Sequence, residues 1–201
     1  MKRLRAGGIG KSRGFTLVEL LAAIVIIGLL ATLATPSFIA MMRDRRVATA
    51  GVIVADLYRE ARTRSLARGN AVIVRWTPAA GGKGTLEMRE TIILPGGVGV
   101  VRSCNNADWS VLSADTRAVR TVSFIGTTYE LVDMKLVTEA GVDATFGETC
   151  FAPDGRTYVR YIANDAFAPL VGVPRYNIDN KNTGFKRQVF LPPNGVARMA
   201  L

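Results

Sequence analysis

The chain has 201 residues, enough for one domain with a hydrophobic core, and its recurring apolar residues exclude a largely disordered chain. It has no histidine, the commonest general base and metal ligand, and its two cysteines lack the close spacing of a zinc site. The formal net charge is +10, but five basic residues and no acid precede Gly14, which leaves a net charge of +5 for the rest. We therefore predict a protein that is not an enzyme and that uses no metal and no cofactor.

The basic leader is followed directly by an apolar run. Residues 15–34 contain one charged side chain, Glu19, and twenty helical residues rise about 30 Å, the thickness of a bilayer's hydrocarbon core. Such a segment suits a secretory signal peptide, a signal anchor or a more specialised export segment. The run is longer than the apolar core of most signal peptides, so we expect a spanning helix. The basic leader predicts a cytoplasmic N-terminus and an exported C-terminal part.

Three residues are unusual for a plain anchor. Glu19 would cost about 2.5–3.5 kcal/mol at the middle of a membrane, less near the interface, and therefore needs a partner. Gly14 lies at the junction of the basic and apolar parts, and Pro36 follows the span, where its ring should weaken or kink the helix. Taken singly, these residues suit snorkelling, a loop glycine and a helix stop. Taken together, they indicate a more specific segment.

The string RGFTLVELLAAIVIIGLLATLATPSF, residues 13–38, closely resembles the N-terminus of type IV pilins and type II secretion pseudopilins. The resemblance implies that a prepilin peptidase cuts between Gly14 and Phe15 and that Phe15 is then N-methylated. It makes Pro36 the helix-weakening proline of the family. It also makes Glu19 an assembly residue that pairs with the Phe15 ammonium of a neighbouring subunit, since two charges buried in an apolar bundle then satisfy each other.

The same resemblance implies a location and partners. We expect a single-pass protein of the bacterial inner membrane, with a cytoplasmic N-terminus and a periplasmic head, that is incorporated into a filament. The expected partners are other pilin or pseudopilin subunits, the prepilin peptidase and inner-membrane lipid.

The helical pattern continues beyond Pro36 to about Arg68. Ile53, Leu57, Ala61 and Ser65 recur every four residues and predict one buried face, and Gly69 followed by Asn70 provides a C-terminal stop. The simplest prediction is one long helix over residues 15–68. Its first half is apolar all round and its second half is amphipathic.

The remaining chain reads as short strands separated by turn residues. The stretch AAGGKGT, residues 79–85, lacks the glycine spacing of a phosphate-binding loop and predicts a hairpin tip. We predict an α+β fold in which one antiparallel β-sheet head packs on the long helix. The expected strands cover residues 71–76, 85–90, 121–124, 128–134, 157–162 and 187–191.

These patterns divide the chain into four parts. We expect a cleaved leader over residues 1–14, a transmembrane and assembly helix over 15–36, the amphipathic half of the helix over 37–69 and the antiparallel β head over 70–201.

Later stretches narrow the resemblance. The strings LYREARTRSLARGNAVIVRW, CFAPDGRTYVRY and FKRQVFLPPNGVARM resemble the GspH/FimT group of minor pseudopilins and minor pilins. Residues 91–150 resemble no family. The resemblance implies a minor pseudopilin of the type II secretion system that assembles into a periplasmic pseudopilus. The alternative is a minor pilin of a type IV pilus, with a role in pilus biogenesis or DNA uptake.

Cys104 and Cys150 are 46 residues apart. If the C-terminal part is exported, a single disulfide is the natural prediction, whereas a reducing compartment would leave two free thiols.

Basic residues in the late strands raise the question of a polyanion partner. If the fold gathered them on one surface, they could contact nucleic acid, but neighbouring acids and few interleaved aromatics make DNA binding the minority prediction. The residues chosen for this contact are Arg156, Arg160, Lys186, Arg187 and Arg198.

Overall fold

A computed structural model describes residues 15–92, 103–105, 107–109, 116–194 and 196–200. The chain divides into two compact units, Met1–Met41 and Met42–Leu201.

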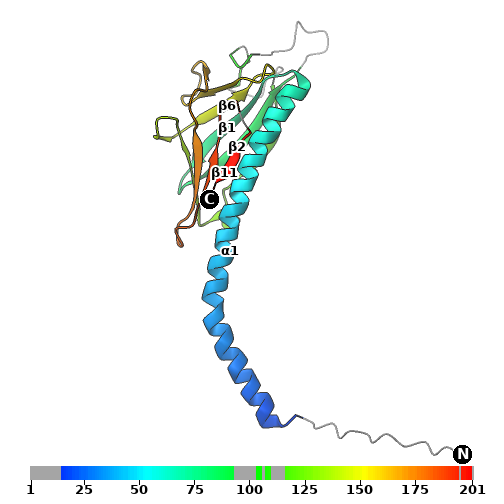
Figure 1. Cartoon of the computed structure of the whole chain (residues 1–201), viewed down its shortest axis with the longest axis vertical. Coiled ribbons are helices and arrows are strands. Elements are labelled where there is room, and N and C mark those ends of the chain that lie inside the picture. Colours follow the sequence, from blue (N-terminus) through cyan, green and yellow to red (C-terminus); the bar gives the residue numbers. More distant parts are fainter. Residues whose placement is uncertain (1–14, 93–102, 106, 110–115, 195, 201) are drawn as a thin grey trace, which may run out of the picture. The chain divides into compact units, whose positions relative to one another are not determined.

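One long helix, α1, runs over Leu17–Arg68 and is continuous through Pro36 (Figure 1). This confirms the predicted long helix to within two residues at its start. The end follows from Gly69, whose φ of 68° lies in the left-handed region that glycine adopts without steric cost. The amide of Gly69 donates to the carbonyl of Ser65 at 3.0 Å and closes the last turn.

Antiparallel strands and one short 3-10 helix form the rest of the described chain. Two predicted strand positions need correction. Residues 128–129 belong to the 3-10 helix rather than to a strand, and the strand at residues 121–124 begins earlier. The elements are β1 (Val72–Ala79), β2 (Lys83–Thr91), β3 (Thr116–Ser123), η1 (Thr127–Tyr129), β4 (Val132–Val137), β5 (Asp143–Ala144), β6 (Gly147–Phe151), β7 (Thr157–Arg160), β8 (Ala168–Pro169), β9 (Arg175–Asn180), β10 (Lys186–Phe190) and β11 (Arg198–Ala200).

The long helix and the antiparallel strands confirm the predicted α+β fold, and the strands form two sheets where one was expected. Sheet A has the order β3-β2-β1-β6-β7-β8, and sheet B has the order β11-β10-β9-β4-β5. The chain passes from sheet A to sheet B at β4 and returns at β6, so neighbours in sequence are not always neighbours in a sheet. The β1–β2 hairpin turns at residues 80–82, which confirms the predicted hairpin tip.

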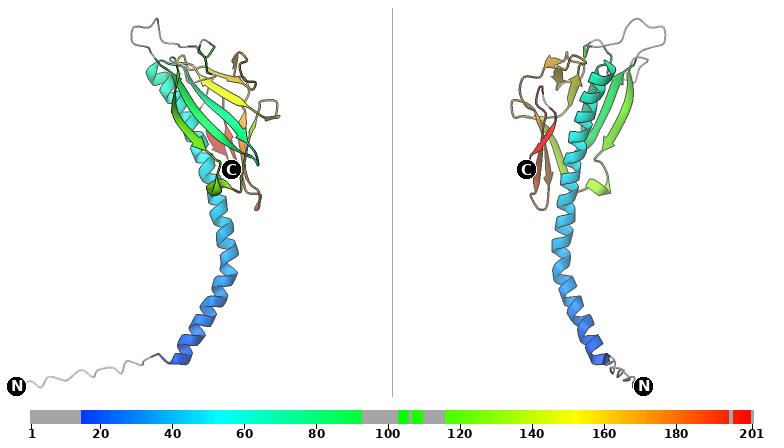
Figure 2. Two further views of the ribbon diagram at one scale, coloured as in Figure 1. Left: turned by 180° about the vertical axis from the view of Figure 1, so that it is seen from behind. Right: turned by 45° about the vertical axis from the view of Figure 1, so that its right-hand side comes forward.

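The main hydrophobic core lies where the second half of α1 meets the inner faces of both sheets. In the right-hand view of Figure 2, strands of the two sheets lie on either side of the helix. Leu57 and Ala61 are fully buried, as predicted, but the helix also buries Val54 and Tyr58. A helix face wider than a single stripe is needed because α1 contacts two sheets instead of one.

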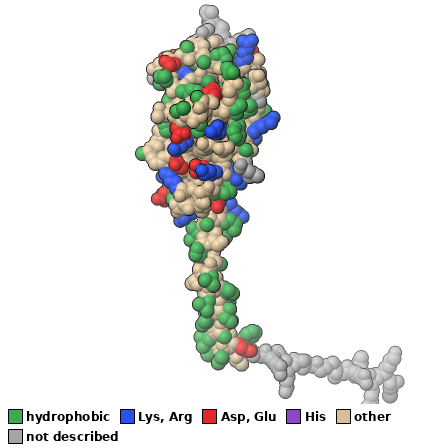
Figure 3. Space-filling model, turned by 60° about the vertical axis from the view of Figure 1, so that its left-hand side comes forward, with side chains coloured by type: hydrophobic (Ala, Val, Ile, Leu, Met, Phe, Trp, Pro, Cys, Tyr) green, Lys and Arg blue, Asp and Glu red, His purple; other side chains and the backbone are tan. Residues whose placement is uncertain are grey.

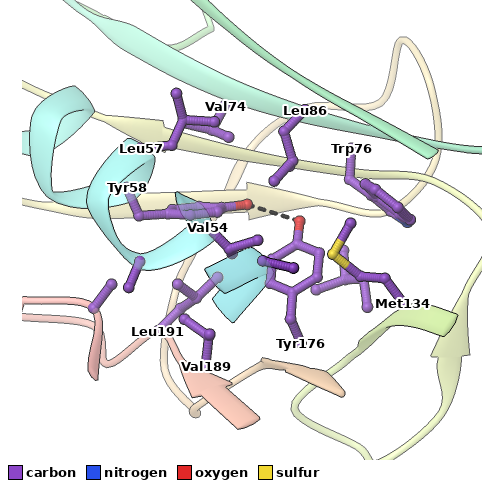
Figure 4. Packing of buried hydrophobic residues seen from close by; sticks show 14 of the residues in the cluster. Val54, Leu57, Tyr58, Val74, Trp76, Leu86, Met134, Tyr176, Val189 and Leu191 are labelled. Atoms are coloured by element: carbon purple, nitrogen blue, oxygen red, sulfur yellow. Dashed lines mark hydrogen bonds between the residues drawn. The ribbon is translucent and has the colours of Figure 1, made fainter. Parts of the chain in front are cut away.

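A pair of tyrosines marks the centre of this core (Figure 4). The hydroxyl oxygens of Tyr58, on α1, and Tyr176, on β9, lie 2.9 Å apart and share a hydrogen bond. Trp76 of β1 packs edge-on against Tyr176, with ring centroids 5.7 Å apart. Burial raises the pKa of Tyr58 to about 12, so this phenol stays protonated and can satisfy its neighbour within the core.

Charged residues fix the end of α1 to the edge of sheet A. The carboxylate of Glu90, on β2, is 1% exposed and accepts hydrogen bonds from Arg64 and Arg68 of α1 and from Arg117 of β3. The Arg68 Nη1–Glu90 Oε1 distance is 2.7 Å. Three guanidinium groups from two elements therefore satisfy one buried carboxylate, which a single partner would do less completely.

The outer face of sheet A carries a second, smaller core. It consists of Ala71, Ile73, Cys104, Trp109, Cys150, Ala152 and Phe167. Across the same face, the strand registers align a row of alternating charges, Arg160–Glu148–Arg75–Glu87. Opposite charges on directly facing strand positions stabilise the sheet.

Candidate processing and assembly site

The start of α1 is a capping box built from Thr16 and Glu19. The backbone amide and the hydroxyl of Thr16 each donate to Glu19 Oε2 at 2.9 Å, and the amide of Glu19 donates to the hydroxyl of Thr16 at 3.3 Å. This reciprocal arrangement satisfies donors that a helix N-terminus leaves unpaired. Within one chain, Glu19 therefore has a local partner.

This local role of Glu19 was not among the predictions. The signal was present, because Thr16-Leu17-Val18-Glu19 has the Thr-x-x-Glu spacing of a capping box directly before an apolar run. The Glu19 carboxylate is therefore held by Thr16 at the start of the helix. The predicted cut lies between Gly14 and Phe15, and Gly14 is outside the described residues.

The helix after this box presents apolar side chains all round. Leu17, Ile24 and Leu33 are 75%, 58% and 77% exposed, and Figure 3 shows hydrophobic side chains along this part of α1. Among the described residues, α1 is the one helix long and apolar enough to cross a membrane. In a soluble protein, other parts of the chain or a partner would cover such a surface, because exposed apolar area is unfavourable in water.

The two cysteines are joined by a disulfide in the structure. Cys150 lies on β6 and Cys104 in the segment over the outer face of sheet A, and the two residues are 0% and 3% exposed. The indole of Trp109 donates to the carbonyl of Cys104 at 2.8 Å. The disulfide thus holds residues 103–105 and 107–109 on the face of the sheet that carries Ile73.

The candidate polyanion residues are distributed over both sheets. Arg160 lies on β7, where its side chain is 9% exposed and paired with Glu148. Arg156 lies in the turn before β7 and is paired with Asp154. Lys186 and Arg187 lie on β10 and Arg198 on β11, all three in sheet B. Of these five residues, Arg160 is the one whose guanidinium group pairs with a fully buried carboxylate, so it is not free to bind a polyanion.

The part of the chain that the structure describes holds no group of three or more acidic, cysteine or histidine side chains arranged for a metal ion.

Residues 9–35 match the prokaryotic N-terminal methylation motif. No curated protein and no solved structure matches the chain. The matched segment contains Gly14, Phe15 and the Thr16–Glu19 capping box, followed by most of the apolar run.

The N-terminal segment is therefore that of a type IV pilin-like protein or pseudopilin, and the long helix with antiparallel sheets is the α+β arrangement of that class. The motif implies processing by a prepilin peptidase and assembly with other pilin-type subunits. The long apolar helix and the motif together fit a membrane-anchored pilin.

Proposed function

We propose that the chain is a minor pseudopilin of the GspH/FimT type, a non-enzymatic subunit of the type II secretion system that assembles into a periplasmic pseudopilus. The observation that carries the proposal is the methylation motif at the start of a 52-residue helix whose first half is uncovered. The resemblance of residues 57–76, 150–161 and 185–199 to the GspH/FimT group supports the subtype.

In this proposal the helix works in two environments. After the leader is removed, residues 15–36 reside in the inner membrane, with the N-terminus on the cytoplasmic side and the head in the periplasm. The subunit then moves into a filament, where the apolar surface of α1 is covered by neighbouring helices instead of lipid. Lipid and protein can both cover this surface, because lipid tails are as apolar as the side chains of a neighbouring helix.

Glu19 provides the register of this assembly. In the single chain its carboxylate is held by Thr16 at the helix start. Cleavage before Phe15 creates an ammonium group, and the Glu19 carboxylate of one subunit can bind the ammonium of the next. A subunit in the wrong register would leave both charges unpaired in an apolar bundle, at a cost of several kcal/mol.

The second candidate is a minor pilin of a type IV pilus, which the same motif favours equally. The two candidates differ in the phenotype of cells that lack the protein. Loss of a pseudopilin abolishes export of secreted proteins, whereas loss of a pilin abolishes surface pili. A deletion strain complemented with the full chain therefore separates them.

Replacing Gly14 by valine is expected to block removal of the leader in cells that contain a prepilin peptidase. The branched side chain would occupy the space through which the peptidase approaches the bond between residues 14 and 15. Intact-mass spectrometry should show wild-type protein beginning at N-methylated Phe15 and the variant retaining residues 1–14. Gly10→Val is the matched control and should be processed normally. A fully processed Gly14→Val variant would contradict the proposed function.

Replacing Glu19 by glutamine is expected to reduce incorporation into filaments strongly while leaving processing intact. Glutamine at this position preserves the capping box but removes the charge. Thr16→Ala is the matched control, because it removes the hydroxyl that bonds to Glu19 and retains both the backbone amide of residue 16 and the carboxylate. The measurement is the amount of each variant in sheared filaments relative to membranes. Equal incorporation of Glu19→Gln and wild type would show that the charge does not act in assembly.

A further inference from the structure

Exposed large apolar side chains of the β head are gathered at two places. After α1, seven such residues are found among those the structure describes. Scattered single residues of this kind are normal on a protein surface, whereas groups mark sites of protein contact. Four of them are in or beside the segments 138–142 and 161–173, two are at the C-terminal strand β11, and one is apart; these are Val142, Ile162, Val171 and Val173, then Val196 and Met199, then Ile125.

The first place is a groove of about 430 Å³ beside β8, the last strand of sheet A. We call it the β8 groove. Its apolar wall is open to solvent, since Ile162 is 64% and Val171 is 87% exposed. The residues that line it include Glu139, Tyr161, Ile162, Asp165, Pro169 and Val171.

The β8 groove carries negative charge. Glu139 and Asp165 are exposed at its rim, and the one arginine that lines it, Arg160, is paired with the buried carboxylate of Glu148. The hydroxyl of Tyr161 donates to Glu139 Oε2 at 2.7 Å and holds this carboxylate over the groove. Burial, followed by this hydrogen bond, raises the pKa of Tyr161, so the phenol remains a donor.

The position of Glu139 is fixed from the other side by Gly172. A Cβ atom at residue 172 would lie 2.6 Å from the Cβ of Glu139, so only glycine permits this close approach. The two segments that form the groove are therefore packed against each other, which gives it a defined shape.

The second place has the opposite charge and a similar apolar character. β11 is the edge strand of sheet B, and Val196, Arg198 and Met199 are all exposed there. Val196 precedes the strand, and it and Arg198 are both exposed on either side of the buried Ala197. β11 and β5 are opposite edges of sheet B, and Glu139 lies in the turn that joins β4 to β5.

We propose that the β8 groove of one head binds the β11 edge of a second copy of the same chain. Arg198 faces Glu139 and Asp165 across this contact, and Val196 packs on Ile162 and Val171. Burying these apolar groups removes them from water, and the charges select the orientation. Because two different surfaces meet, the contact is heterologous, and each copy keeps a free groove or edge for a further partner.

This contact goes beyond the proposed function, because leader removal and membrane insertion do not need it. It is tested in cells that make the full chain with the photo-crosslinking residue p-benzoylphenylalanine in place of Ile162. We expect a product of twice the mass of the chain, whose crosslinked peptide contains residues 196–200. A product with another protein only, or with another part of the chain only, would overturn the proposal.

Charge reversal gives an independent measurement in the same cells. Arg198→Glu is expected to lower the yield of the crosslinked dimer about fivefold, the effect of roughly one exposed charge pair. The chain that carries both Arg198→Glu and Glu139→Lys should recover the yield. Glu130→Lys, an exposed reversal outside the groove, is the matched control and should leave it unchanged.

Equal yields for wild type and Arg198→Glu would contradict the assigned orientation. Leader removal is measured in the same samples. Processed chains without a self-crosslink overturn this inference and leave the proposed function intact, whereas unprocessed chains overturn the proposed function itself.

Discussion

Replacing Cys104 and Cys150 together by alanine is expected to lower the free energy of unfolding of the chain by about 4 kcal/mol. The disulfide closes a segment of 46 residues, and this length sets the entropy that the cross-link removes from the unfolded chain. Both cysteines are buried, so the change also removes contacts from the smaller core on sheet A.

The effect should be local before it is global. Without the disulfide, residues 107–109 are still held on sheet A by Trp109 and by hydrogen bonds from Arg75 and Arg89 to the Trp109 carbonyl, and Asn105 is held by hydrogen bonds with Phe167. Trp109 is 2% exposed, so its fluorescence should shift toward that of a solvated indole at a lower denaturant concentration than the signal of Trp76.

The measurement is chemical denaturation of the full chain in detergent, with unfolding monitored by tryptophan fluorescence. Ser103→Ala is the matched control, because it changes an exposed side chain next to Cys104 and keeps the disulfide. A double variant that loses less than about 1 kcal/mol would show that the segment is held without the cross-link.

Replacing Glu148 by alanine is expected to lower the free energy of unfolding by about 3–5 kcal/mol. The Glu148 carboxylate is fully buried and bonded to Arg75 and Arg160, which are 14% and 9% exposed. Removing it leaves two buried guanidinium groups without their carboxylate, and burying an unpaired charge is among the most costly changes in a protein.

A matched control separates burial from charge pairing as such. Asp143→Ala breaks the pair with Lys135, in which both side chains are more than half exposed, and should cost less than about 1 kcal/mol. A second variant, with Glu148→Leu, Arg75→Met and Arg160→Met, should regain most of the lost stability, because it removes all three buried charges.

These values are compared in one denaturation series on the full chain. If Glu148→Ala and Asp143→Ala cost the same, the row of alternating charges on sheet A does not stabilise the head.

The helix and its N-terminal motif were determined by the sequence alone. An apolar run, a basic leader and the order Gly14-Phe15 are local patterns, which can be recognised without knowledge of distant residues. The Gly69 stop is equally local, since one residue with a positive φ ends the helix. The Thr16–Glu19 capping box is equally local, because it depends only on the Thr-x-x-Glu spacing before the apolar run.

The two-sheet arrangement was decided only by the tertiary structure. β6 buries every residue and therefore shows no alternation, and β9 carries Asn and Asp side chains that are typical of turns. The β6 pattern does not predict a strand from its own residues, and in β9 the turn-type residues obscure the alternation of Tyr176 and Ile178 with polar neighbours. Each becomes a strand because its neighbours in the sheet, β1 and β7 for β6, supply hydrogen bonds and cover its faces.

Tertiary structure also decided which side chains meet across the outer face of sheet A. The sequence offers Arg160 as a surface cation and leaves the state of Cys104 and Cys150 open. The register of β1, β6 and β7 sets Glu148 between two arginines, and the segment that contains Cys104 reaches β6 at Cys150. Such pairings depend on contacts between residues distant in the chain, so composition and periodicity carry no information about them.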